Sequence, residues 1–276
     1  MTGFSPLVKM NKSLTERTLF GIHPGGGLTV PYIPFAKGLE KEVSFVGLQA
    51  PELFSDNIFC SMDEQVYYYI DLIKRHQESG PYLLFGWSYG AAIAYEIASE
   101  LYKSGDEIAY LCLLDFPPKT TYSLSDESEL WSEVLRRVCM GRINLGCSPL
   151  NVMAEEDVVD FCIKEFDRQS VPLLSVCGSR IRFIRYIINE AHRFINYEAS
   201  RSSLNFDLFM AEISSADTMM RSMLGISDTS YHKQWEDYTS GAIRCINLGG
   251  SHHGIIASPY VNTITDAMRT KISSLF

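Results

Sequence analysis

Residues 82–98 read YLLFGWSYGAAIAYEIA, and this stretch decides the fold. The apolar run Tyr82–Phe85 predicts a buried strand, and the helix-forming run that starts at Ala91 predicts a helix directly after it. Between them lies Gly86-Trp87-Ser88-Tyr89-Gly90, a G-x-S-x-G sequence. A serine at such a strand-to-helix turn is exposed at the edge of a sheet, where only small neighbours fit beside it. The pattern therefore favours a nucleophilic Ser88, and a glycine-rich turn without chemistry is the alternative.

The rest of the chain alternates strands and helices in the same way. Strands are predicted at 18–22, 43–46, 108–114, 206–211 and 242–248, and helices at 29–39, 61–77, 89–102 and 258–275. Continuous apolar strands between amphipathic helices are typical of a parallel sheet covered on both faces. The predicted fold class is α/β, with a mostly parallel twisted sheet flanked by helices.

An insertion of roughly 80 residues interrupts this alternation. No convincing strand occurs from Ser123 to Arg201, and helical patterns cover 125–142, 154–169 and 179–200. Since the insertion follows the carboxyl end of a strand, where open α/β sheets bind ligands, we interpret it as a lid. A structural helical subdomain without a gating role is the alternative. The prediction is one domain, 1–276, with a core at about 17–117 and 204–276 and a helical lid at about 118–203.

Composition narrows the class of protein. Hydrophobic residues make up 46% of the 276 residues, charged residues make up 21%, and the formal net charge is −9. The negative charge argues against nucleic-acid binding, and no apolar run is long enough to span a bilayer. The N-terminus lacks the apolar segment of a signal peptide, so a cytoplasmic location is expected. The seven cysteines include no C-x-x-C pair, which favours buried reduced thiols over disulfides or a metal site.

A nucleophilic serine needs a base that takes its proton and an acid that orients the base. Of the six histidines, His252 and His253 lie on a glycine-flanked loop after the last predicted strand. That loop is where a hydrolase places its base, and the order Ser…Asp…His is the expected one. A surface-loop histidine without a catalytic role is the alternative for either, and the residue pattern alone does not choose between them.

Two aspartates are candidates for the orienting acid. Asp115 ends the strand 108–114, beside the strand that leads to Ser88, and Asp217 lies past the next strand. We favour Asp115 because Phe116-Pro117-Pro118 gives the chain a stiff exit behind its carboxylate. A plain turn or N-cap role for Asp115 is the alternative.

Backbone N–H groups are expected to stabilise the oxyanion that forms when the serine attacks. One candidate is the N–H of Tyr89, directly after the nucleophile. The other is the N–H of Gly25 in the loop His23–Gly27, since Pro24 has none. A phosphate-binding loop is the rival interpretation of these glycines, but no Gly-Lys-Ser/Thr follows them.

Six segments resemble the thioesterase domains that end nonribosomal peptide synthetases and some polyketide synthases, and the resemblance runs nearly end to end. They are SPLV at 5–8, LFGIHPGGG at 19–27, VGLQAP at 46–51, GWSYG at 86–90, LLD at 113–115 and GSH at 250–252. The resemblance implies an α/β-hydrolase fold with Asp115 as the acid and His252 as the base. Two positions depart from the family pattern: Ala91 replaces a common glycine, and His253 stands where an aromatic residue is frequent, which keeps His253 as a rival base.

The resemblance also implies a reaction. An acyl or peptidyl chain on the phosphopantetheine of a carrier protein passes to Ser88 as an ester and is released by hydrolysis or macrocyclisation. The domain then needs no cofactor of its own, and its partner is an acyl or peptidyl carrier protein or domain. An excised terminal domain and a free-standing enzyme both fit. The alternatives are a stand-alone editing thioesterase, a carrier-independent esterase of the same fold and, less favoured, a non-catalytic binding module.

The insertion is rich in arginine although the protein is acidic. Its last predicted helix region carries Arg180, Arg182, Arg185, Arg193 and Arg201. Arg182, Arg185 and Arg193 can share one helical face, so we hypothesise that this face helps to bind an acidic carrier. A solvated surface face is the alternative.

Overall fold

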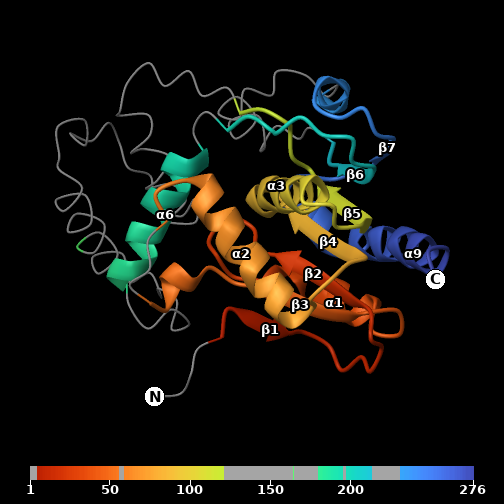
Figure 1. The fold of residues 1–276 in the computed structure, drawn as a ribbon, viewed down its shortest axis with the longest axis horizontal. Coiled ribbons are helices and arrows are strands. Elements are labelled where there is room, and N and C mark those ends of the chain that lie inside the picture. The colour runs from red at the N-terminus through yellow and green to blue at the C-terminus, as the bar shows by residue number, and fades with distance from the viewer. Residues whose placement is uncertain (1–4, 56–58, 121–163, 165–179, 195–196, 213–230) are drawn as a thin grey trace.

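The computed structural model describes residues 5–55, 59–120, 164, 180–194, 197–212 and 231–276. In this part of the chain, seven strands form one sheet in the order β1-β3-β2-β4-β5-β6-β7 (Figure 1). All neighbouring strands are parallel except β1 and β3, which are antiparallel. The strands are β1 (Leu7–Lys9), β2 (Thr18–Ile22), β3 (Ser44–Leu48), β4 (Tyr82–Trp87), β5 (Ile108–Leu114), β6 (Phe206–Met210) and β7 (Ile243–Asn247).

Helices cover both faces of the sheet, with α2 (Met62–His76) and α3 (Tyr89–Lys103) on one face and α1 (Ile33–Gly38) and α9 (Tyr260–Ser273) on the other. The described residues also form α6 (Arg180–Phe194) and α8 (Tyr231–Gln234). Short 3-10 turns lie at η1 (Val30–Tyr32), η2 (Pro51–Leu53), η4 (Trp235–Asp237) and η5 (Gly254–Ile256). Helix α2 begins as the sequence predicts, because the Ser61 hydroxyl accepts the Glu64 N–H at 3.2 Å. The predicted helix at 29–39 divides into η1 and α1.

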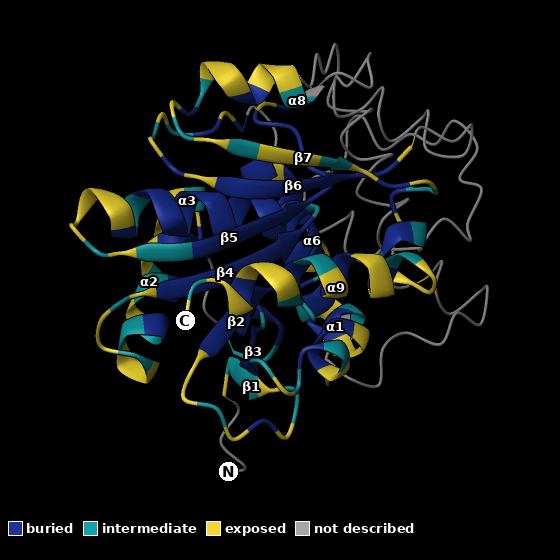
Figure 2. Ribbon diagram, turned by 90° about the vertical axis from the view of Figure 1, so that its right-hand side faces the viewer, coloured by how far each residue is buried: buried dark blue, intermediate teal, exposed yellow. Residues whose placement is uncertain are grey.

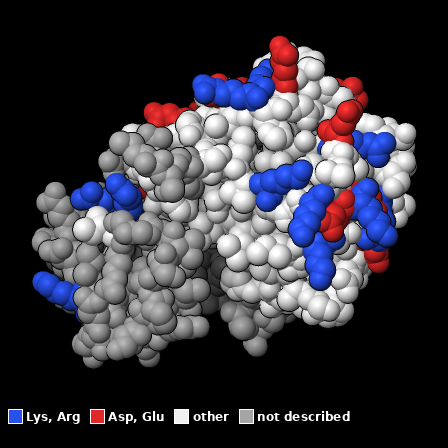
Figure 3. Space-filling view, turned by 90° about the horizontal axis from the view of Figure 1, so that it is seen from below, with Lys and Arg blue, Asp and Glu red and all other residues white. Residues whose placement is uncertain are grey.

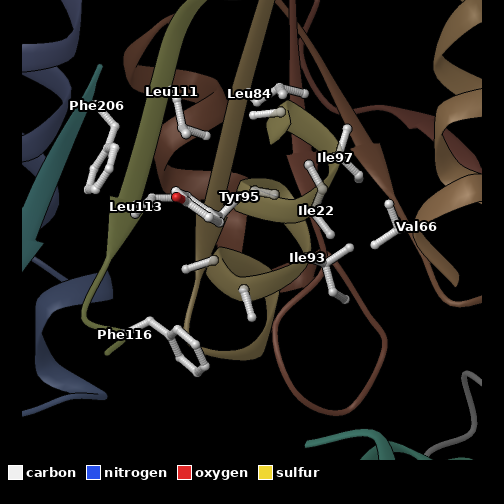
Figure 4. Close-up of a cluster of buried hydrophobic side chains, with 14 of the residues drawn as sticks. Ile22, Val66, Leu84, Ile93, Tyr95, Ile97, Leu111, Leu113, Phe116 and Phe206 are labelled. Atoms are coloured by element: carbon white, nitrogen blue, oxygen red, sulfur yellow. The ribbon is translucent and has the colours of Figure 1, made fainter. Parts of the chain in front are cut away.

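The core has two halves because alternate side chains of a strand point to opposite faces of the sheet. Leu84 packs with α2 and α3, as in the close-up of Figure 4, whereas Phe85 packs with α1 and α9. Figure 2 shows the central strands buried and β7, at one edge, more exposed. The predicted class, a mostly parallel sheet with helices on both faces, is confirmed.

Strand β1 is an element that the sequence does not predict, because three residues are too few to show a periodic pattern; β3 supplies its pairing, with Val8 opposite Gly47. The expectation of buried thiols is wrong for two of the three described cysteines: Cys112 is buried, but Cys60 and Cys245 are exposed.

Most of the predicted lid, including the helical patterns at 125–142 and 154–169, lies outside the described residues. The helix predicted at 179–200 is described as α6, and it does not continue to Ser200. Residues 197–199 instead pair with 118–120, where Thr120 donates to the Tyr197 carbonyl at 2.9 Å and Ala199 to the Pro118 carbonyl at 2.7 Å. The two ends of the insertion are thus hydrogen-bonded to each other. None of the helices in the described segments has the length and apolar character needed to cross a membrane.

Candidate active site

Ser88 occupies a sharp turn between β4 and α3. Its φ is 57° and its ψ is −128°, a region that residues other than glycine rarely adopt. The flanking glycines allow the turn. A Cβ on Gly86 would lie 2.1 Å from the Gly90 carbonyl oxygen, and a Cβ on Gly90 would lie 2.4 Å from that of Ile22. The predicted strand–turn–helix is confirmed, and the turn holds Ser88 at the carboxyl end of the sheet.

Asp115 and His252 meet at the same edge of the sheet. Asp115 directly follows β5, with a φ of 48°. Its Oδ1 accepts the Ala211 N–H at 3.0 Å, and its Oδ2 lies 2.7 Å from His252 Nδ1. Both side chains are buried. The aspartate and histidine favoured on sequence grounds are therefore brought together, whereas Asp217 lies outside the described residues.

The two neighbouring histidines differ in their surroundings. His252 is buried and His253 is exposed, with their ring centroids 5.2 Å apart. The Trp87 ring, next to Ser88, packs 5.1 Å from the His252 ring and tilts 33° from its plane. His252 is thus placed by Asp115 on one side and by Trp87 on another. The role of Trp87 as a packing partner was not foreseen from the sequence.

The glycine loop that follows β2 lies against the serine turn. A Cβ on Gly90 would come 2.5 Å from the His23 carbonyl oxygen, so the loop and the start of α3 are in direct contact. Gly26 and Gly27 have φ values of 91° and 80°, which glycine adopts without strain. This contact places Gly25 and Tyr89, the two expected N–H donors, on adjoining segments.

A buried polar network lies behind these segments. The Tyr89 hydroxyl donates to Gln65 Oε1 at 2.8 Å and accepts from Arg193 Nε at 3.1 Å. Arg193 Nη1 also donates to Glu52 Oε1 at 2.9 Å and to the Phe59 carbonyl at 2.7 Å. Burial raises the pKa of Tyr89 to about 12, so its hydroxyl keeps its proton at neutral pH. No local sequence pattern points to Glu52 and Gln65, since their partners are remote in the chain.

This network shows that the predicted arginine face is wrong for Arg193. The Arg193 side chain is buried, where its guanidinium forms an ion pair with Glu52 and donates a hydrogen bond to the Tyr89 hydroxyl. It therefore does not share a solvent-facing surface with the other arginines. Arg182 is half-buried and Arg185 is exposed. On the face seen in Figure 3, basic side chains are interspersed with acidic ones. Within the described ranges, no cluster of three or more His, Cys, Asp or Glu side chains could hold a metal ion.

Comparison with known proteins agrees with this architecture. The family model described as "Thioesterase domain" matches residues 17–269. Atromentin synthetase greA from Suillus grevillei is 34% identical over 116 residues, which cover 42% of this chain and 12% of that protein. Aspulvinone E synthetase melA from Aspergillus terreus is 21% identical over 98% of this chain and 30% of its own length. The chain therefore spans less than a third of either synthetase.

A solved structure of the Vlm2 thioesterase domain, bound with a dodecadepsipeptide, has a similar fold. It superposes with a TM-score of 0.67 at 18% identity and covers 96% of both chains. At this identity the likeness concerns the fold alone.

Proposed function

The chain belongs to the thioesterase domain family, and from that premise we propose that Ser88 carries the acyl group, with His252 as its base and Asp115 as the orienting acid. The observation that carries the proposal is the buried 2.7 Å contact between His252 Nδ1 and Asp115 Oδ2, at the sheet edge where the half-buried Ser88 lies. Because the carboxylate accepts the proton on Nδ1, the neutral ring has its lone pair on Nε2. That nitrogen is the one expected to take the proton of Ser88.

The first half-reaction forms the ester. Ser88 Oγ attacks the thioester carbonyl carbon while His252 takes the hydroxyl proton. Negative charge collects on the carbonyl oxygen, where the N–H groups of Gly25 and Tyr89 are proposed to stabilise it. The carbon–sulfur bond then breaks, and the sulfur leaves as a thiol with the proton held by His252.

The second half-reaction releases the chain. Water that loses a proton to His252 attacks the ester and yields a carboxylic acid, whereas an amine or hydroxyl of the chain itself yields a ring. In both cases His252 returns the proton to Ser88 Oγ as the ester bond breaks. Exclusion of water from the site favours the ring.

We further propose that the thioester arrives on the phosphopantetheine of an acyl or peptidyl carrier protein. The names of the relatives support this source, because greA and melA are synthetases that include a segment similar to this chain. Arg182 and Arg185 on α6 are the proposed contacts for the carrier, without Arg193. The proposed lid over 118–203 would close over the acyl chain.

The test is intact mass after exposure to an acyl-pantetheine thioester. Wild-type protein is expected to gain one acyl group transiently, Ser88→Ala to gain none, and His252→Ala to turn over far more slowly. Ser104→Ala, at the opposite end of α3, is the matched serine control and is expected to behave like wild type. A folded wild-type protein that neither gains an acyl group nor consumes thioester would contradict the proposal, and rapid turnover of simple oxygen esters would then favour a carrier-independent esterase.

The carrier contact is tested separately by charge reversal. Arg182→Glu with Arg185→Glu is expected to raise KM for a carrier-bound thioester and to leave turnover of free acyl-pantetheine unchanged. Arg75→Glu, on the exposed surface of α2, is the matched control. Equal KM values for the carrier-bound substrate in all three proteins would contradict a carrier role for α6.

A further inference from the structure

We propose that one face of α6 positions both halves of the oxyanion hole: Glu190 holds the glycine loop, and Arg193 holds the turn at Tyr89. The proposal rests on the function proposed above, since it concerns the two backbone N–H donors of that site. It assigns positioning roles to side chains that touch the donor segments and take no part in bond making.

Glu190 contacts the glycine loop directly. Its carboxylate is buried, and Oε2 accepts the Gly26 N–H at 3.0 Å and the Tyr186 hydroxyl at 2.5 Å. The other oxygen, Oε1, lies 3.1 Å from the point that a Cβ on Gly25 would occupy. The carboxylate thus packs against Gly25 and holds the peptide that follows it, which restrains the position of the Gly25 N–H on the preceding peptide.

Arg193 holds the serine turn from the other side. Its Nε donates to the Tyr89 hydroxyl, while its Nη1 is anchored by Glu52 and the Phe59 carbonyl. Burial alone lowers the pKa of Arg193, but the proximity of Tyr89, Glu52 and Tyr186 raises it above its ordinary value, so the side chain stays charged. A charged donor makes a stronger hydrogen bond than a neutral one, and here it restrains the residue whose N–H follows Ser88.

The two contacts come from one surface of one helix. Residues three apart in a helix lie on the same face, so Glu190 and Arg193 act side by side. Two aromatic rings of α6 extend this surface: Tyr186 packs 6.2 Å from the His23 ring, and Phe194 packs 5.8 Å from the Tyr89 ring. Both donor segments are therefore held by the same rigid element.

A positioning role explains why a charge pair is buried here. Burial of Arg193 and Glu52 costs desolvation, which their attraction offsets only when the geometry is good, so such a pair is weak evidence for stability alone. Donors of an oxyanion hole must instead be fixed closely, since a displacement of about 1 Å can cost about 100-fold in rate. Directional hydrogen bonds from Glu190 and Arg193 supply that restraint.

The test uses conservative variants whose loss of rate is measured per active site. Tyr89→Phe removes only the hydroxyl that Arg193 holds, Arg193→Lys keeps the charge without the guanidinium geometry, and Glu190→Ala removes the acceptor. Each is expected to lower kcat by about 10- to 100-fold at a similar KM, after active sites are counted with a fluorophosphonate. Glu190→Gln keeps an acceptor oxygen and is expected to retain most of the rate, and Arg75→Ala serves as a surface control.

A second measurement, the Kd of a boronic acid, tests the oxyanion hole without thioester chemistry. An alkyl boronic acid forms a tetrahedral adduct with a nucleophilic serine and places an oxygen in the hole, so its Kd is expected to weaken in step with kcat. Tyr89→Phe combined with Arg193→Lys is expected to cost no more than either change alone. The proposal would be overturned if the Tyr89, Arg193 and Glu190 variants kept the wild-type kcat and boronate Kd per active site and showed only a lower Tm. These residues would then contribute to stability alone.

The two proposals can fail separately. Wild-type protein that binds boronate but forms no acyl ester would contradict the proposed function, while the boronate Kd values of the variants would still decide the positioning role. Wild-type protein that neither binds boronate nor forms an ester would contradict both.

Discussion

The imidazole of His252 and the carboxylate of Asp115 are in contact, with 2.7 Å between Nδ1 and Oδ2, although 137 positions separate them in the chain. The other carboxylate oxygen accepts the Ala211 N–H at 3.0 Å. Each oxygen of Asp115 therefore has a defined donor, and the backbone holds the carboxylate in one orientation. The tautomer of His252 therefore depends on the Asp115 oxygen that faces it, and replacing that oxygen with an NH₂ group would change the tautomer.

Asp115→Asn is expected to lower kcat by about 10³- to 10⁴-fold without unfolding the protein. The Ala211 N–H requires an acceptor, so the asparagine would turn its carbonyl oxygen toward Ala211 and its NH₂ toward His252. Nδ1 would then accept, and the proton would move to Nε2, where it blocks uptake of the Ser88 proton. The measurement is kcat for an acyl-pantetheine thioester, with circular dichroism to establish folding. A loss below tenfold would show that Asp115 is not the orienting acid.

His252→Ala and His253→Ala are expected to differ sharply. Because the Asp115 carboxylate contacts His252, loss of His252 is expected to reduce kcat/KM by about 10³-fold or more. Loss of the exposed ring of His253 is expected to cost less than about tenfold. Parallel kcat/KM measurements on the two variants decide the matter. A larger loss in His253→Ala would reverse the assignment of the base.

The sequence predicts those parts of the fold that depend on neighbouring residues, namely the serine turn and the central strands. The turn at Ser88 was foreseen because small residues at 86 and 90 are a steric requirement, and the sheet because its strands are continuous apolar runs. Strand β1 was missed, since its three residues form a strand only through pairing with β3. Helix α6 ends before the sequence pattern does, because residues 197–199 pair with residues 118–120.

Three residues of the candidate site could be predicted because each has a local signal in the sequence. Ser88, Asp115 and His252 each follow a strand, so the carboxyl edge of a parallel sheet gathers them. Glu190, Arg193 and Glu52 come from an insertion and a loop, and no local pattern states which buried groups they contact. An arginine on a helix in an acidic protein resembles a surface residue until its carboxylate partner is known, which is why Arg193 was assigned wrongly.

Gly90→Ala is expected to destabilise the protein by about 3 kcal/mol, at the upper end of the range for overpacking. The new Cβ would lie 2.4 Å and 2.5 Å from the carbonyl oxygens of Ile22 and His23, and backbone atoms at these positions must move to admit it. Gly105→Ala, beyond the far end of α3, is the matched control. That glycine has a φ of 88° and no neighbouring atom within 4 Å, so only a backbone cost of about 1 kcal/mol is expected. Urea unfolding of both variants gives the comparison, and equal costs would contradict the close approach at the serine turn.

Stability is expected to fall between pH 6.5 and pH 4 because of His23. This residue is buried; Nδ1 donates to the Pro24 carbonyl at 2.9 Å, so Nε2 accepts the Tyr69 hydroxyl at 2.7 Å, and the ring is neutral. Burial, opposed by the Pro24 carbonyl and assisted by Arg193, lowers the pKa of His23 to about 4, against 6.5 for an ordinary histidine.

Between these two values the unfolded chain binds a proton at His23 that the folded protein does not bind. Unfolding is therefore favoured as the pH falls through this window, by up to about 3 kcal/mol from this group. His23→Asn, which keeps a donor for the Pro24 carbonyl but cannot titrate, is expected to lose this part of the pH dependence even if its stability is lower at pH 7.5. The free energy of unfolding in urea at pH 7.5, 6 and 5 gives the two slopes. Parallel slopes for the variant and wild type would mean that His23 is protonated in the folded protein, and the contacts with Pro24 and Tyr69 would then have to rearrange around a charged ring.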